Sequence, residues 1–296
     1  MKFLRTLLLS LSLLMVSLLP ALADVTYIQR HTNLGIFSAQ QGRWERADGH
    51  LEKAMAMAKK VFGEISEPYH RAIEVRYKVA FKRGDEEQAI RWMRECLMVK
   101  HTLFSDRPGA WAVGQADMAA VLANNGNFKQ ALSYSQDAVE VLSEVIGASQ
   151  QETLRPRIIQ TRILTGLKRY DEAQKQLEQL EEEILATFGQ RHYLTAMLLT
   201  SQARLALKRK QLPQALEALA QAHAIRSKLR GSHHPHTLLN AIPFIKLSLK
   251  LNPQDHKALQ LIRDAQAYFK QNPQADATLQ ARYNKLAKKL LYRSHK

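Results

Sequence analysis

One short pattern, a glycine or lysine followed five residues later by an alanine, recurs along the chain at a fixed interval. Its alanines lie 42 residues apart, at Ala47, Ala89, Ala131, Ala173 and Ala215. A second marker keeps the same interval, at Gly63, Ser105, Gly147, Gly189 and Gly231. Two independent markers that share one period, with no insertion between the units, predict an array of structural repeats.

Each repeat is expected to be a pair of helices. The chain is rich in Ala, Leu, Gln, Glu, Lys and Arg, and after residue 24 no segment shows sustained strand alternation. In the first repeat, helices are expected at about 26–40 and 44–61. Gly42 lies in the turn between them and can adopt a positive φ at little cost. Trp44 is expected to wedge between the helices, and Ala47 is small because the first helix crosses close to it.

The fixed interval predicts the organisation of the chain from residue 24 onward. Repeats are expected at about 26–63, 68–105, 110–147, 152–189 and 194–231, within residues 24–240. Residues 241–296 are expected to form a degenerate sixth unit, in which Ala258 is one residue off the interval, and a basic C-terminal helix that caps the array.

Residues 1–23 have the features of a secretory signal peptide. Lys2 and Arg5 precede an apolar run from Leu7 to Leu19, and the sequence Ala21-Leu22-Ala23 is typical of a cleavage site. The apolar run is shorter than the roughly 20 residues that a membrane-spanning helix needs. We therefore expect cleavage after Ala23 and a periplasmic or secreted protein.

The charge of the chain is strongly basic, with a net charge of +16 at neutral pH. Export makes nucleic acid an unexpected partner and leaves acidic proteins, anionic polymers or phospholipid head groups. The single cysteine, Cys96, cannot form an internal disulfide. It occupies a position that is alanine in most other repeats, so we expect a buried side chain and no redox or nucleophilic role.

The turn pattern resembles a known repeat family. A glycine, an aromatic two residues later and an alanine after three more is the signature between the helices of tetratricopeptide repeats. Units of 42 residues are similar to those of kinesin light chain, whose connecting loop resembles Gly231-Ser232-His233-His234-Pro235. The resemblance covers about residues 26–240. It implies an all-α, right-handed superhelical solenoid of antiparallel helix pairs, in which the first helix of each pair (helix A) lines a concave groove that binds protein segments without a cofactor.

Counting back from each alanine gives the residues expected to face this groove. Positions seven and eleven residues before the alanine lie one helical turn apart on helix A, and the position eighteen before extends the same face. The predicted partner-binding residues are Arg71, Lys78, Lys82, Asn124, Arg155, Arg162, Arg204 and Lys208. A groove of one dominant charge attracts opposite charge, and arginine can hold a carboxylate through two hydrogen bonds.

These features predict a non-enzymatic scaffold or adaptor that binds acidic peptide or protein segments, in a cell-envelope assembly. A binder of anionic envelope polymer or lipid head groups, using the groove and the basic helix from Arg282 to Arg293, is the alternative. No catalytic motif of a metalloprotease, serine hydrolase or nucleotide-binding protein occurs. His233, His234 and His236 lack a nearby Cys, Asp or Glu to complete a metal site, so no metal and no cofactor are expected.

Overall fold

A computed structural model describes residues 23–294, with side-chain surroundings for residues 23–288. The predicted signal peptide, apart from Ala23, lies outside the described residues. No helix in the described part of the chain combines the length and the apolar character needed to cross a membrane.

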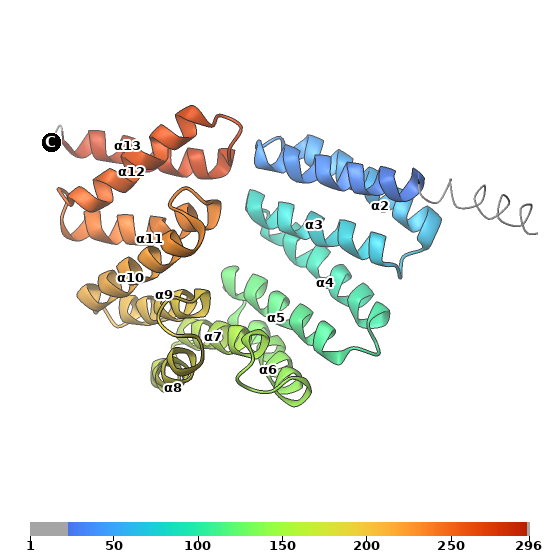
Figure 1. Ribbon diagram of the computed structural model, residues 1–296, viewed down its shortest axis with the longest axis horizontal. Coiled ribbons are helices and arrows are strands. Elements are labelled where there is room, and N and C mark those ends of the chain that lie inside the picture. The colour runs from blue at the N-terminus through green and yellow to red at the C-terminus, as the bar shows by residue number, and fades with distance from the viewer. Residues whose placement is uncertain (1–22, 295–296) are drawn as a thin grey trace, which may run out of the picture. The chain divides into compact units, whose positions relative to one another are not determined.

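The chain divides into two compact units, with the boundary after Ser105. The first unit contains a helix over residues 23–40, followed by α2 (Trp44–Phe62), α3 (Glu67–Arg83) and α4 (Glu86–Leu103). Each of the labelled helices packs against the next one along the chain, so α3 lies between α2 and α4 (Figure 1).

The second unit continues the same arrangement with more helices. In order, they are α5 (Pro108–Asn124), α6 (Phe128–Val145), α7 (Gln151–Gly166), α8 (Tyr170–Phe188), α9 (Tyr193–Lys208), α10 (Leu212–Arg230), α11 (Pro235–Leu251), α12 (His256–Gln271) and α13 (Ala277–Ser294). Consecutive helices pack against each other, and the odd-numbered α5, α7 and α9 also pack from one repeat to the next. The expected fold class, an all-α tetratricopeptide-like solenoid of helix pairs, is confirmed.

The alanines of the repeat pattern lie where helices cross most closely. Ala47, Ala89, Ala131, Ala173 and Ala215 are each 0% exposed, so any larger side chain there would collide with the neighbouring helix. Cys96 is likewise buried, as expected. The hydrophobic core therefore follows the repeat interval along the chain instead of enclosing a single centre.

The turn inside each helix pair has the same backbone conformation whether or not it contains glycine. Gly42, Gly84 and Gly126 have φ angles of 71°, 85° and 79°. At the equivalent positions, Lys168 and Lys210 have φ angles of 64° and 62°. The turn therefore requires a left-handed residue, and the two lysines adopt a conformation that L-residues disfavour.

The repeat pattern is broken at two places, in backbone conformation at Ser105 and in spacing within the sixth unit. Gly63, Gly147, Gly189 and Gly231 have positive φ, whereas Ser105 does not, and the boundary between the two units follows Ser105 directly. In the sixth unit, the interval is lost in the turn at residues 252–255, where the side chain of Asp255 caps α12 by accepting a hydrogen bond from the N–H of Ala258. The slip therefore comes after α11, which keeps the register of the earlier repeats.

Candidate partner-binding surface

The predicted binding residues of the first unit all lie on α3, and their surroundings differ. Arg71 is exposed and lines a cavity of about 280 Å³ with Gln29 and Glu67. Lys78 is exposed but forms an ion pair with Glu74, with 2.7 Å between Nζ and Oε1. Lys82 is half-buried. Of these cations, Lys78 is already balanced by a carboxylate on its own helix, which weakens its attraction for a partner.

In the second unit, Arg155 is also neutralised within the chain. Its Nη2 lies 2.7 Å from Oδ1 of Asp117, which reaches it from α5. Asn124 is exposed at the end of α5 and is available as a neutral hydrogen-bonding group. The contribution of Arg155 to a basic surface is therefore smaller than its position in the sequence suggests.

Neither Arg162 nor Arg204 has a carboxylate partner among the residues whose side chains the structure describes. The Nη2 of Arg162 donates a hydrogen bond of 3.0 Å to the carbonyl of Ala120, at the equivalent position one repeat earlier. Its Nε is buried and makes no hydrogen bond within the described part of the chain. Burial, and then repulsion by Arg204, lowers the pKa of Arg162 to about 10. Because this value is still well above neutral pH, Arg162 remains charged and is stabilised by any carboxylate that approaches it.

Arg204 is exposed to solvent, yet burial among surrounding protein atoms lowers its pKa as well. The two observations agree if solvent reaches the guanidinium from one side only, as on a concave surface. Among the described residues, Arg204 makes no hydrogen bond or ion pair. The structure therefore brings Arg162 on α7 and Arg204 on α9 close enough to repel each other.

The repeat register adds two lysines of α11 at the equivalent positions one repeat beyond the predicted residues. Because α11 keeps the register, Lys246 and Lys250 occupy the positions of Arg204 and Lys208, and both are exposed. The sequence prediction did not reach them because it counted back only from the five alanines that keep the interval, and Ala258 lies one residue off it. We refer to these cations together as the basic row. The basic row consists of Arg162, Arg204, Lys208, Lys246 and Lys250.

Acidic residues are absent from the helices that carry most of the basic row. Neither α9 nor α11 contains an Asp or Glu anywhere along its length. In α7, the only acid is Glu152, in the first turn and far from Arg162. The acids of this part of the chain lie instead on the second helices of the pairs, above all on α8. Positive charge on the basic row is therefore not offset by its own helices.

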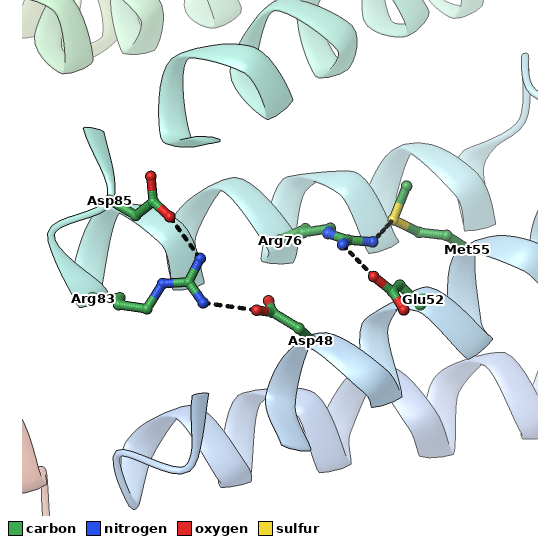
Figure 2. A network of polar contacts seen from close by, with 6 residues as sticks. All are labelled: Asp48, Glu52, Met55, Arg76, Arg83 and Asp85. Atoms are coloured by element: carbon green, nitrogen blue, oxygen red, sulfur yellow. Dashed lines mark hydrogen bonds and ion pairs between the residues drawn. The ribbon is translucent and has the colours of Figure 1, made fainter. Parts of the chain in front are cut away.

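A second polar region, in the first unit, was not anticipated from the sequence. Arg83 bridges α2 and the start of α4, with Nη1 2.7 Å from Asp48 and Nη2 2.9 Å from Asp85 (Figure 2). Arg76 contacts Glu52 at 2.7 Å and stacks on the ring of Trp92, 4.2 Å from its centroid. All of these residues except Glu52 line a cavity of about 370 Å³. Because both arginines are balanced by acids, the network joins helices more readily than it binds an external anion.

The histidine-rich loop has a structural explanation. His233 stacks on Tyr268, with 4.8 Å between ring centroids, and Nδ1 of His234 accepts a hydrogen bond from the N–H of His236 at the start of α11. Across residues 23–288, no group of three or more His, Cys, Asp or Glu side chains is arranged to hold a metal ion.

Cys96 lies beside a histidine but in a setting that suppresses thiol chemistry. Its Sγ is 3.4 Å from Nε2 of His70. Both side chains are buried, and burial lowers the pKa of His70. Because a buried neutral imidazole offers no positive charge to stabilise a thiolate, the pair favours the uncharged thiol.

Comparison with known proteins supports the repeat family. The family model described as tetratricopeptide repeat matches residues 32–68, which run from the middle of the first helix through α2 to the start of α3. No curated protein sequence matches the chain at a significant level.

Several solved structures have a similar fold at low sequence identity. A putative kinesin light chain with TPR-like repeats from Podosopora anserina is 19% identical, with a TM-score of 0.56 over 70% of this chain and 97% of that chain. A Rap protein, solved in complex with competence and sporulation factor, is 12% identical, with a TM-score of 0.57 over 92% of this chain and 88% of that chain. BtubC from P. vanneervenii is 18% identical, with a TM-score of 0.50 over 77% of this chain and 89% of that chain. Residues 32–68 thus match the tetratricopeptide repeat family, and the chain has a fold similar to that of kinesin-light-chain-like repeats.

Proposed function

We propose that this protein is a non-enzymatic scaffold that binds an acidic peptide or protein segment along the basic row of its second unit. Tetratricopeptide repeat proteins bind protein partners, and the Rap protein of similar fold was solved with a bound factor. The observation that carries the proposal is the pair of arginines, Arg162 and Arg204, which have no carboxylate partner in the described part of the chain, although Arg162 has a buried, unsatisfied Nε.

The physical basis is the cost that these two arginines impose on the free protein. A partly buried guanidinium without a counter-ion is poorly solvated, and a like charge in the next repeat raises its free energy further. A carboxylate between Arg162 and Arg204 would accept hydrogen bonds from both and remove the repulsion. Lys208, Lys246 and Lys250 would then attract further acids of the same segment, in a way that added salt weakens.

The test uses a fluorescent oligoglutamate peptide, with an oligoglutamine peptide of the same length as the uncharged control. Fluorescence anisotropy should show binding of oligoglutamate alone, with an affinity that falls as salt is added. Exchange of Arg204 and Lys246 for Glu should weaken binding at least tenfold, about 1.4 kcal/mol, since both side chains are exposed on the basic row.

The matched control reverses two exposed lysines on the second helices of the same unit, Lys129→Glu in α6 and Lys175→Glu in α8. This variant has the same net charge as the first, so equal loss of binding in both would show that only overall charge matters and would refute the proposed surface. Circular dichroism should give the same helicity for both. A soluble polyphosphate that binds in preference to oligoglutamate would favour the anionic-polymer alternative.

We also propose that the chain is exported and processed after Ala23, on the sequence pattern of residues 1–23. Mass spectrometry of the protein recovered from an expressing bacterium tests this directly. A mature N-terminus at Asp24 in the periplasmic or secreted fraction is the expected result, and an intact Met1 in the cytosolic fraction would refute it.

A further inference from the structure

The first helix of the first repeat differs from the first helices of later repeats at two positions. At the position of Arg30, the later repeats have Ala72, Gly114, Pro156 and Leu198. All of these are buried, whereas Arg30 is exposed. The next position is His31 here but the fully buried Ile73 in the second repeat. A terminal repeat is expected to have polar residues at positions that are buried in the other repeats, but it does not require both Arg30 and the next residue, His31, to be basic.

Further basic residues of the first unit surround a pair of histidines that contact each other. His31, on the helix of residues 23–40, and His50, on α2, have their Nδ1 atoms 3.0 Å apart. The positive charges of Arg30 and Lys53 oppose protonation of His31, and those of Arg46 and Lys53 oppose protonation of His50. Arg30, Arg46 and Lys53 are exposed. We call Arg30, His31, Arg46, His50 and Lys53 the edge patch.

The carboxylates of α2 face away from the edge patch. Asp48 and Glu52 point toward α3, where they pair with Arg83 and Arg76 (Figure 2). The other acids on these two helices are Asp24 and Glu45, and neither acts appreciably on the two histidines. Asp48 and Glu52 of α2 are therefore engaged inside the unit, whereas Arg46, His50 and Lys53 lie in the edge patch.

An aromatic side chain accompanies the bases on the first helix. Tyr27 packs on the ring of His31, with 4.3 Å between centroids, and is 37% exposed. Val25 lies on the opposite side of this helix, where it lines a cavity with Glu67 and Arg71 of α3. Lysine and arginine beside an exposed aromatic residue are typical of surfaces that lie on a bilayer, because the ring enters the interface while the bases meet the head groups.

We propose that the edge patch, with Tyr27, docks the first unit onto an anionic phospholipid surface. This surface is separate from the basic row of the second unit, so the protein would hold its partner beside a membrane. Each Lys or Arg near such a surface increases partitioning about fivefold, and the effect is screened by salt.

Docking should strengthen as pH falls. The contact between the two Nδ1 atoms requires that at least one imidazole be neutral, because a proton on both nitrogens would place two donors face to face. Desolvation, together with the neighbouring bases, holds the pKa of both histidines below the ordinary value near 6.5. The negative charge of an anionic bilayer raises the pKa of both histidines. A fall in pH therefore adds positive charge to the edge patch when the bilayer is present.

The experiment is cosedimentation of the purified protein, processed as the cell leaves it, with phosphatidylcholine vesicles that contain or lack phosphatidylglycerol. The protein should sediment with the anionic vesicles only. The double variant Arg30→Gln and Lys53→Gln should partition about 25-fold more weakly, because it lacks two bases. The control, Lys129→Gln with Lys175→Gln, removes the same charge from exposed sites on α6 and α8 and should partition as the unmodified protein does.

The pH dependence provides a second readout. Between about pH 7.5 and about pH 5.5, partitioning of the unmodified protein should increase severalfold, whereas His31→Gln with His50→Gln should bind equally at both values. Circular dichroism excludes loss of folding as the cause. The proposal would be overturned if the edge-patch variant and the control partitioned equally. It would also be overturned if the protein bound neutral vesicles as well as anionic ones, or bound soluble polyphosphate but no vesicles.

Discussion

Replacement of the two turn lysines by glycine should stabilise the protein. Lys168 and Lys210 have φ angles of 64° and 62° and occupy the positions of Gly42, Gly84 and Gly126 in the other repeats. The hydrogen bonds of these turns are the same in each case. The N–H of Arg169 donates to Leu164 and that of Gln211 to Ala206, as that of Asn127 donates to Leu122 after Gly126. The lysines therefore occupy a helix-end position that glycine fills without strain.

The size of the effect follows from two opposing terms. A residue with a Cβ in the left-handed conformation costs about 1–2 kcal/mol. Glycine avoids that cost but loses more conformational entropy on folding, by about 0.5–1 kcal/mol. The net gain is therefore about 0.5–1 kcal/mol for each of Lys168→Gly and Lys210→Gly. In a unit of this size, 1 kcal/mol raises the melting temperature by about 2–4 °C.

Thermal unfolding followed by circular dichroism measures the gain, and both sites lie in the second unit, so their effects should add. The control is Lys168→Ala, which removes the same charge but keeps a Cβ and should bring no comparable stabilisation. In the opposite direction, Gly126→Lys should lower the melting temperature by a similar amount. If Lys168→Gly and Lys168→Ala changed stability equally, the backbone strain would not be the cause and the reasoning would fail.

Three further predictions concern the interior and the histidine pair. A Cβ on Gly166 would lie 2.4 Å from the ring of Phe128, so Gly166→Ala should destabilise the second unit by about 1–3 kcal/mol in urea unfolding. Gly49 lies within α2 with open space around it, so Gly49→Ala should stabilise the first unit by about 0.5–1 kcal/mol in the same assay. Because the pKa values of His31 and His50 are lowered by folding, their contribution to stability is complete above about pH 6.5 and is lost as pH falls through the folded values; in the absence of lipid, His50→Gln should flatten this dependence in thermal scans. Cys96, which is 3% exposed, should react with an aromatic disulfide reagent only on unfolding, and rapid reaction in the native protein would contradict its buried position.

The helix pairs were predictable because the repeat interval constrains each unit several times over. The alanine of each repeat must be small where two helices cross, and all of these alanines are buried as expected. What the interval could not give is the conformation of a turn that has lost its glycine. Lys168 and Lys210 are good helix formers by composition, and only the packing of the flanking helices forces them into the left-handed region.

The candidate surface was predictable in position but not in charge balance. Counting from the alanines placed Lys78 and Arg155 on helix A, where the structure also has them, but it could not show that Glu74 and Asp117 neutralise them. Such pairs depend on side-chain conformation and on the offset between neighbouring helices, which a repeat interval does not specify. Lys246 and Lys250 were missed for the opposite reason, since a single inserted residue in the following turn disguised an intact register.

The distribution of acids offers the strongest argument that the basic row is selected for charge. A basic chain with randomly placed charges would still have some Asp or Glu on α9 and α11, yet these helices have none, while α8 alone contains Asp171, Glu172, Glu178 and a run of three glutamates from Glu181. Solubility does not demand this separation, because mixed charges solvate a helix equally well. Placing acids on one helix of a repeat and bases on the other affects binding only if one of the two faces meets a charged partner. Exchange of exposed charges between α8 and α9, at constant net charge, should therefore abolish oligoglutamate binding while the melting temperature changes little.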